Sequence, residues 1–237
     1  MKLLAFETAT EACSVALWID GEVRERFGVA PRRHAELALP WADRLLAEAG
    51  IAKAELDAVA VGRGPGAFTG VRLGVALGQG IALALDLPVL PVSTLAALAM
   101  RGAAPAGDGD PGILAAIDAR MGEVYWAAYR REGAGVAPVS AEAVSAPDAV
   151  VLADAEGAWR GVGTGFAAAD GLLQQSLGAR LQSVDATALP RAADVAVLAA
   201  AAFARGEAVA ADRLEPAYLR DNVAMTIAEQ QAFRDAR

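Results

Sequence analysis

Cysteine and histidine are almost absent from this chain of 237 residues, which has one of each, Cys13 and His34. A single cysteine excludes a disulfide within the chain and any metal site built from several thiolates. A single histidine excludes the histidine pair that many catalytic metal sites require. We expect Cys13 to be a small core residue in a strand, and His34 to be a surface or interface residue at the start of a helix.

Positive charge is also scarce: the chain has 21 lysine and arginine residues against 29 aspartate and glutamate residues, which gives a net charge of -8. Phosphate neutralisation needs a basic face, so the chain is not expected to hold a nucleic acid on its own. Uninterrupted apolar runs are short: the longest contains Arg72 and Gln79 and ends at Asp86, below the ~20 clean residues of a membrane span. Residues 1–6 meet Glu7 before an export signal could develop, which predicts a cytoplasmic protein.

Hydrophobic residues nevertheless make up 55% of the chain, and their spacing in the first hundred residues predicts the order βββαβαβα. Asp20-Gly21 is a hairpin signal between two of the opening strands, and Pro40 must begin or kink the first helix. Strands are expected over 2–8, 13–19, 22–27, 56–61 and 89–92, and helices over 33–49, 69–85 and 94–100.

A linker is expected at residues 102–112, which read GAAPAGDGDPG. It predicts an N-terminal lobe over 1–104 and a C-terminal lobe over 112–237. In the second lobe we expect strands over 113–118, 123–130, 136–144 and 160–165, and helices from about Pro147, over 166–176 and over 192–205. The last helix is rich in alanine and could dock back on the first lobe.

The helix predicted over 69–85, with Thr69 as its cap, is apolar on every side. Such a helix is expected to be buried all round. Interior glycines cost about 1 kcal/mol each against alanine, so another element should approach the helix closely, either from the same domain or from a second subunit. Three stripes follow its axis: Leu73, Leu77, Ile81 and Leu85; Gly70, Gly74, Gly78 and Ala82; and Ala76, Gly80 and Ala84.

A glycine-rich loop, GRGPGAFTG over residues 62–70, separates a strand from this helix, a place where backbone N–H groups can cradle phosphate. It has no Walker lysine, and Pro65 interrupts a dinucleotide fingerprint. The carboxylate and hydroxyl that end the first strand could hold a metal-bound nucleotide. A tight turn and local capping are the favoured alternatives. The weak cofactor candidates are Glu7, Thr8, Gly64 and Gly66. Asp118 and Arg120 offer a structural ion pair or a partner contact, of which we favour the first.

Six blocks of sequence, LAFETATEACSVAL, GRGPGAFTGVRLG, PVSTLAALA, IDARMGEVYWA, GVGTGF and EPAYLRDNVA, resemble the TsaB (YeaZ) family in order and spacing. This family is the bacterial partner subunit of the tRNA threonylcarbamoyladenosine machinery. The resemblance runs nearly end to end and implies an α/β, actin-like (ribonuclease-H-like) fold of two related lobes. One departure is Glu7, where the family usually has aspartate, which weakens the case for nucleotide binding.

The resemblance also implies partners. The catalytic paralogue TsaD binds metal through a His-x-x-x-His helix and transfers the threonylcarbamoyl group, and TsaE is a small ATPase. Thr94 and Leu98 stand where the paralogue has its histidines, so neither metal binding nor transfer is expected of this chain. ATP and a metal ion are expected in the partner subunits, and no cofactor is assigned to this one.

We therefore predict a non-catalytic scaffold and activator that binds TsaD, helps to recruit TsaE, forms a homodimer when alone and reaches tRNA only through the complex. The alternatives are a stand-alone actin-fold ATPase or small-molecule kinase, and a glycoprotease-like peptidase, which the missing histidine pair disfavours. The expected partner surface comprises His34, Leu37, Trp41, Leu45, Arg72, Leu73, Gly74, Ala76, Leu77, Gly78, Gly80 and Ile81.

Overall fold

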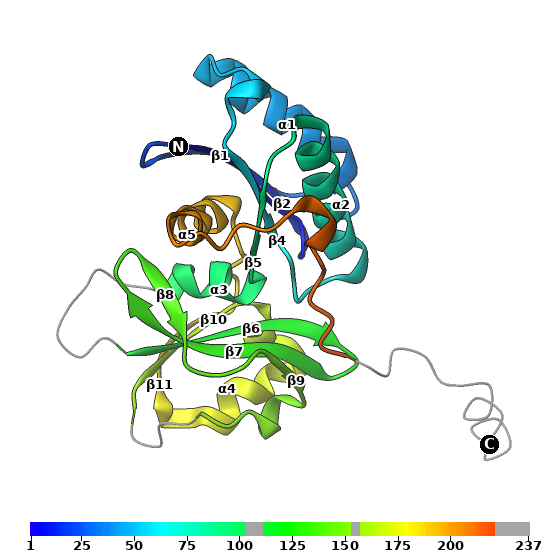
Figure 1. Cartoon of the computed structure of the whole chain (residues 1–237). Helices are drawn as coiled ribbons and strands as arrows, with labels where there is room; N and C mark the ends of the chain where they lie inside the picture. The colour runs from blue at the N-terminus through cyan, green and yellow to red at the C-terminus, as the bar shows by residue number, and fades with distance from the viewer. Residues whose placement is uncertain (103–110, 153–156, 221–237) are drawn as a thin grey trace, which may run out of the picture.

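Two β-sheets form the frame of the molecule in the computed structural model, which describes residues 1–102, 111–152 and 157–220 (Figure 1). The first sheet has the order β3-β2-β1-β4-β5. Strands β1 to β3 are antiparallel, and β4 and β5 run parallel to β1, which confirms the predicted opening. Its members are β1 (Lys2–Glu7), β2 (Ala12–Ile19), β3 (Glu22–Val29), β4 (Ala58–Gly62) and β5 (Val89–Val92).

The second sheet has the order β11-β10-β6-β7-β8, with β9 paired to β7. The segment predicted as one strand over 136–144 is two short strands, and the edge strand β11 was not predicted, because its side chains are largely exposed and lack apolar alternation. The middle of the predicted linker, 103–110, lies outside the described residues. The strands are β6 (Gly112–Arg120), β7 (Glu123–Glu132), β8 (Gly135–Pro138), β9 (Ala143–Ser145), β10 (Trp159–Val162) and β11 (Leu181–Asp185).

Helices and sheets alternate in layers (Figure 1). Helices α1 (His34–Ala49) and α2 (Phe68–Leu85) cover one face of the first sheet, and α5 (Ala192–Ala204) covers the other. Helix α3 (Thr94–Ala99) packs between the sheets, while α4 (Leu172–Leu177) lies on the outer face of the second. Although α5 comes from the end of the chain, it packs on β1 and β2, and the N–H of Ala192 donates to Ser14 Oγ at 2.9 Å.

Three helical predictions need correction. The helix expected from Pro147 is one 3₁₀ turn, Pro147–Ala149. The helix expected over 166–176 is broken, because Ala169, Asp170 and Gly171 have φ of 47°, 54° and 75°, outside the right-handed helical region. Only α4 forms there. Helix α2 begins one residue early, at Phe68, and its N-cap is Ala67 with no side-chain bond, so Thr69 is not the cap.

Candidate functional site

The inner face of α2 carries its glycines against the protein's own first sheet. A methyl group at Gly70 would lie 2.1 Å from the carbonyl oxygen of Thr8, and one at Gly78 would lie 2.4 Å from Val61 Cγ2. At Gly74 it would lie 2.9 Å from Thr8 Oγ1. These glycines therefore allow close helix-to-sheet packing. We had placed Gly74 and Gly78 on a partner surface, and the inward direction of this stripe corrects that expectation.

The outer face of α2 is open. Arg72, Ala76, Gly80 and Leu83 are exposed, Leu83 by 68%, and a methyl group at Gly80 would meet nothing within 4 Å. We call these four residues, with the half-buried Leu73, Leu77 and Ile81 beside them, the outer face. The expectation that the helix is buried all round is therefore wrong for the single chain, in which 33% of it is buried.

Length and composition alone would let α2 cross a membrane, and among the described helices it is the one that meets this test. Its inner face nevertheless packs on the first sheet through Val71, Val75 and Ala82, which are all buried. An apolar strip remains on the side away from the sheet. Monomers rarely leave a large contiguous apolar area uncovered unless it binds something.

Helix α1 contributes less to this surface than expected. His34 is 8% exposed, and its Nε2 lies 2.9 Å from the carbonyl oxygen of Thr10 and 3.1 Å from that of Ala12. Since both neighbours are acceptors, Nε2 carries the proton and donates, which ties the start of α1 to the turn after β1. Leu45 is 2% exposed and belongs to the core. Leu37 and Trp41 remain half-buried against the core, and the Trp41 ring lies over Gly28 of β3.

The carboxyl group of Glu7 is enclosed at the end of β1. Its Oε1 accepts from the N–H of Ala9 at 2.7 Å, and its Oε2 accepts from Thr94 Oγ1 at 3.0 Å. Thr94 Oγ1 in turn accepts from the N–H of Gly64 at 3.1 Å. A methyl group at Gly62 would lie 1.9 Å from Glu7 Oε2. Burial raises the pKa of Glu7 to about 7, against the opposing effect of these hydrogen bonds.

The glycine loop closes on the same strand end. Thr8 Oγ1 donates to the carbonyl oxygen of Gly70 at 2.7 Å. The N–H of Ala67 donates to the carbonyl oxygen of Ala9, also at 2.7 Å. A methyl group at Gly66 would lie 2.3 Å from the Ala9 carbonyl oxygen. The fold thus brings Glu7, Thr8, Gly64 and Gly66 together as the sequence suggested, but their polar groups bond to one another and to adjacent backbone.

Within residues 1–102, 111–152 and 157–220, no group of three or more His, Cys, Asp or Glu side chains is arranged so that it could hold a metal ion. Thr94 and Leu98, which the resemblance is expected to place where the paralogue has its histidines, are both fully buried. Thr94 bonds to Glu7, and Leu98 packs between α3 and the second sheet. Both side chains have structural partners.

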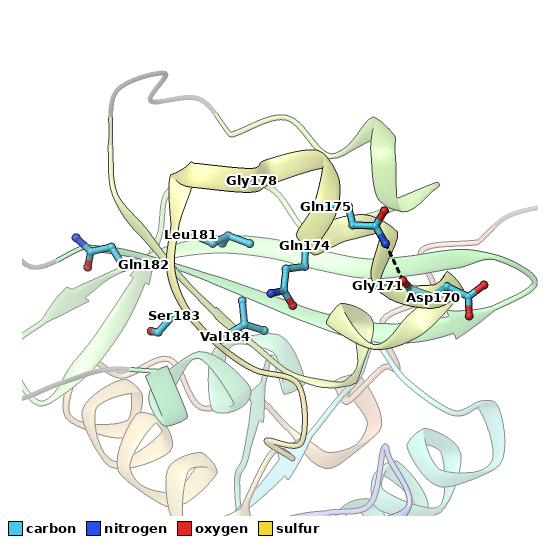
Figure 2. Close-up of a pocket in the computed structure, with 9 residues that line it drawn as sticks. All are labelled: Asp170, Gly171, Gln174, Gln175, Gly178, Leu181, Gln182, Ser183 and Val184. Carbon is cyan, nitrogen blue, oxygen red and sulfur yellow. Dashed lines mark hydrogen bonds between the residues drawn. The ribbon is translucent and has the colours of Figure 1, made fainter.

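A separate hollow of about 500 Å³ lies between α4 and β11, and none of its lining residues belongs to β1 or α2 (Figure 2). Gln174, Gln175 and Gln182 line it, and Gln175 Nε2 donates to the Asp170 carbonyl oxygen at 2.9 Å. Its polar side chains are exposed, and no basic residue lines it. Sequence patterns did not indicate this hollow, because β11 was not predicted.

Two further polar features lie at the β6–β7 turn and beside α2. Asp118 Oδ2 pairs with Arg120 at 2.8 Å, which confirms a structural ion pair at the β6–β7 turn. The segment 214–220, which we call the strap, reaches α2, where the Nε of Arg72 donates to Tyr218 Oη at 2.8 Å. Exposed Phe68 lies under the same guanidinium. Phe68 and Tyr218 were missed, since nothing local in the sequence relates Tyr218 to a helix 146 residues away.

The βββαβαβα order and two covered sheets define an α/β protein of the actin-like, ribonuclease-H-like fold class. The family model for tRNA N6-adenosine threonylcarbamoyltransferase, TsaD, matches residues 21–228. The tRNA threonylcarbamoyladenosine biosynthesis protein TsaB of Escherichia coli K12 is 45% identical over 94% of this chain and 96% of its own. The Haemophilus influenzae TsaB is 38% identical over 94% of this chain and 95% of its own length.

A solved structure, YeaZ from Pseudomonas aeruginosa, superposes with a TM-score of 0.84 at 44% identity, covering 92% of this chain and 99% of that one. The chain therefore belongs to the TsaB (YeaZ) family.

Proposed function

We propose that this chain is a non-catalytic scaffold and activator in the biosynthesis of tRNA threonylcarbamoyladenosine, the process named for its TsaB relatives. It binds the catalytic paralogue TsaD through the outer face of α2 and through Leu37 and Trp41 of α1, and helps to recruit the ATPase TsaE. The observation that carries the proposal is the outer face itself, an apolar strip along an 18-residue helix. Burial of this strip by a partner is favourable at about 25 cal/mol per Å² of apolar surface.

The enclosed Glu7 supports a non-catalytic role. A nucleotide or metal ion bound there would have to displace the Ala9 and Thr94 hydrogen bonds and the packed glycine loop. The rival assignment of a stand-alone ATPase or kinase depends on these same groups. We therefore assign ATP and metal to the partner subunits. We also place this subunit in the cytoplasm with its partners, and we expect it to contact tRNA only through the complex.

When TsaD is absent, a second copy of the chain is expected to cover the outer face. The two copies would use the same patch, as in other two-fold dimers. Sizing by light scattering across a range of concentrations tests this. A chain that stays monomeric to high concentration would contradict the homodimer and leave the TsaD interaction to be tested separately.

Reconstituted threonylcarbamoyl transfer tests the proposed role. Purified TsaD, TsaE, substrate and tRNA are expected to give full transfer only when this chain is added, and the chain alone is expected to give none. Equal transfer in its absence would refute the scaffold and activator role. Steady ATP turnover by the purified chain that is abolished by Glu7→Gln would instead support the ATPase alternative.

Ala76→Glu is expected to weaken association with TsaD by about 10- to 100-fold, because docking would bury an unpaired carboxylate. Ala76 is exposed in the single chain, so the change removes no internal packing. The affinity is measured by calorimetry at equal salt. Ala179→Glu is the matched control, since Ala179 is an exposed alanine near α4 in the second sheet's outer layer. Equal affinities for the two variants would exclude the outer face as the interface.

A further inference from the structure

The strap links the two sheets along one side of the molecule, running from beside α2 to the end of the β6–β7 hairpin (Figure 1, orange-red). It starts in the core, where Leu214 is 2% exposed and its carbonyl oxygen accepts from Gln79 Nε2 at 3.0 Å. The N–H of Ala217 then donates to the carbonyl oxygen of Arg63 at 2.8 Å. These bonds fix the path of the backbone toward Tyr218.

Tyr218 holds the one charged side chain of α2. Its hydroxyl accepts from Arg72 Nε at 2.8 Å, and the guanidinium carbon lies 3.6 Å from the ring centre of Phe68 and 5.5 Å from that of Tyr218. Phe68 and Tyr218 are 56% and 54% exposed. Bonding and stacking immobilise a long side chain that would otherwise lose conformational entropy on binding. Arg72 is therefore preorganised at the surface.

The unused donors of Arg72 point to the chemistry of a ligand. A guanidinium has five N–H donors, and the hydrogen bond that Arg72 makes within the described part of the chain uses Nε. The two terminal amino groups remain as the fork that binds a carboxylate in a bidentate manner. No carboxylate lies within α2 itself, so the matching group has to come from elsewhere.

The far end of the strap is anchored away from α2. Arg220 donates to the carbonyl oxygen of Ala119 at 3.3 Å, pairs with the Glu123 carboxylate, and has one amino group 3.6 Å from Met121 Sδ. All three partners belong to the β6–β7 hairpin or its turn. Arg220 is two residues from Tyr218, so this anchor limits where the tyrosine ring can move.

We propose that Tyr218 is a positioning residue of the docking surface: it holds Arg72 so that the guanidinium fork pairs with an aspartate or glutamate of the partner protein, and Arg220 anchors the strap that carries it. This inference rests on the proposed function. It extends the surface from the apolar strip of α2 to a charged end built from segments 146 residues apart. Arginine and tyrosine are among the residue types enriched where a few side chains dominate binding energy.

A double-mutant cycle tests the inference with the full chain and TsaD. Arg72→Ala is expected to weaken binding about tenfold, and Tyr218→Phe, which removes only the hydroxyl, by about threefold to tenfold. On the Arg72→Ala background, Tyr218→Phe is expected to have no further effect, because the tyrosine acts through the arginine. Arg72→Lys should not restore binding, since lysine lacks the planar fork. Independent, additive losses, or no loss from either single change, would overturn the proposal.

Arg220→Ala tests the anchor, with Arg205→Ala, which breaks an exposed ion pair to Glu207, as its control. Faster hydrogen exchange over residues 214–220 and a loss of affinity like that of Tyr218→Phe are expected. Unchanged exchange and affinity would refute the anchor role. Ala76→Glu distinguishes the proposed docking surface from the positioning role of Tyr218. If Ala76→Glu weakens binding while the Arg72 and Tyr218 variants do not, only the positioning role is wrong. If Ala76→Glu also binds normally, the proposed docking surface itself is wrong.

Discussion

Gly70→Ala is expected to lower the free energy of unfolding by about 3 kcal/mol or more. The added methyl group would lie 2.1 Å from the carbonyl oxygen of Thr8 and 3.1 Å from its carbonyl carbon. These are backbone atoms of the residue that follows β1, and they cannot rotate away as the end of a side chain can. Either α2 moves off the sheet or the end of β1 shifts, and both changes loosen the packing around Glu7. Urea denaturation at fixed pH measures the effect.

Gly80→Ala is the matched control on the same helix. Gly80 points outward and a methyl group there meets nothing within 4 Å, so alanine adds only its better helix propensity. We expect the free energy of unfolding to rise by up to about 1 kcal/mol. Opposite signs for the two variants would establish which face of α2 packs on the sheet. Similar losses for both would contradict the assigned orientation.

Spacing in the sequence was sufficient to predict the five strands of the first sheet, although not their order within it. Strands β1, β2 and β5 carry apolar runs bounded by turn residues, and their observed ends fall within one residue of those expected. The reason is physical: a strand between two helical layers has to be apolar on both faces, and a turn such as Asp20-Gly21 admits few alternatives. The first half of the fold follows from such local rules.

The direction of α2 could not be predicted, because its three stripes are all apolar or small. Periodicity identifies residues that share a face, but it does not say which face the sheet will take. The same limit explains His34, whose burial depends on carbonyl groups of a turn more than 20 residues earlier. The contact of Tyr218 with Arg72 is a third example, since only the folded chain brings them together.

Helix α2 accounts both for the proposed lack of catalysis and for the proposed binding of a partner. The glycines on the inner face of α2 let it approach Thr8 and Val61 so closely that the glycine loop and the end of β1 fill the space beside Glu7. The outer face leaves Ala76 and Leu83 exposed, with Leu73, Leu77 and Ile81 half-buried beside them. Close packing on one side therefore accompanies an enclosed polar cluster, and the open side supplies a surface for a second protein.

Glu7→Gln is expected to stabilise the fold at alkaline pH by up to about 3 kcal/mol. Burial raises the pKa of Glu7 from 4.5 to about 7, so the folded chain prefers the neutral carboxyl group. Below pH 4.5 the group is protonated in both states and its contribution is fully present. As the pH rises toward 7 the unfolded chain loses the proton first, and the free energy of unfolding falls. Each pKa unit is worth about 1.4 kcal/mol.

Glutamine is neutral at every pH. Its amide oxygen can accept from the Ala9 N–H, and its amide nitrogen would donate to Thr94 Oγ1, as a protonated carboxyl group would, in place of the bond that Oε2 accepts from Thr94. The difference in free energy of unfolding between variant and parent should therefore be near zero at pH 4.5, rise through pH 7 and level off above it. Urea denaturation across this range measures it, with Glu11→Gln, at an exposed position, as a control for net charge. A flat difference would mean that the carboxylate is charged in the folded chain at neutral pH and is stabilised there by its hydrogen bonds, so the enclosed cluster would tolerate an anion.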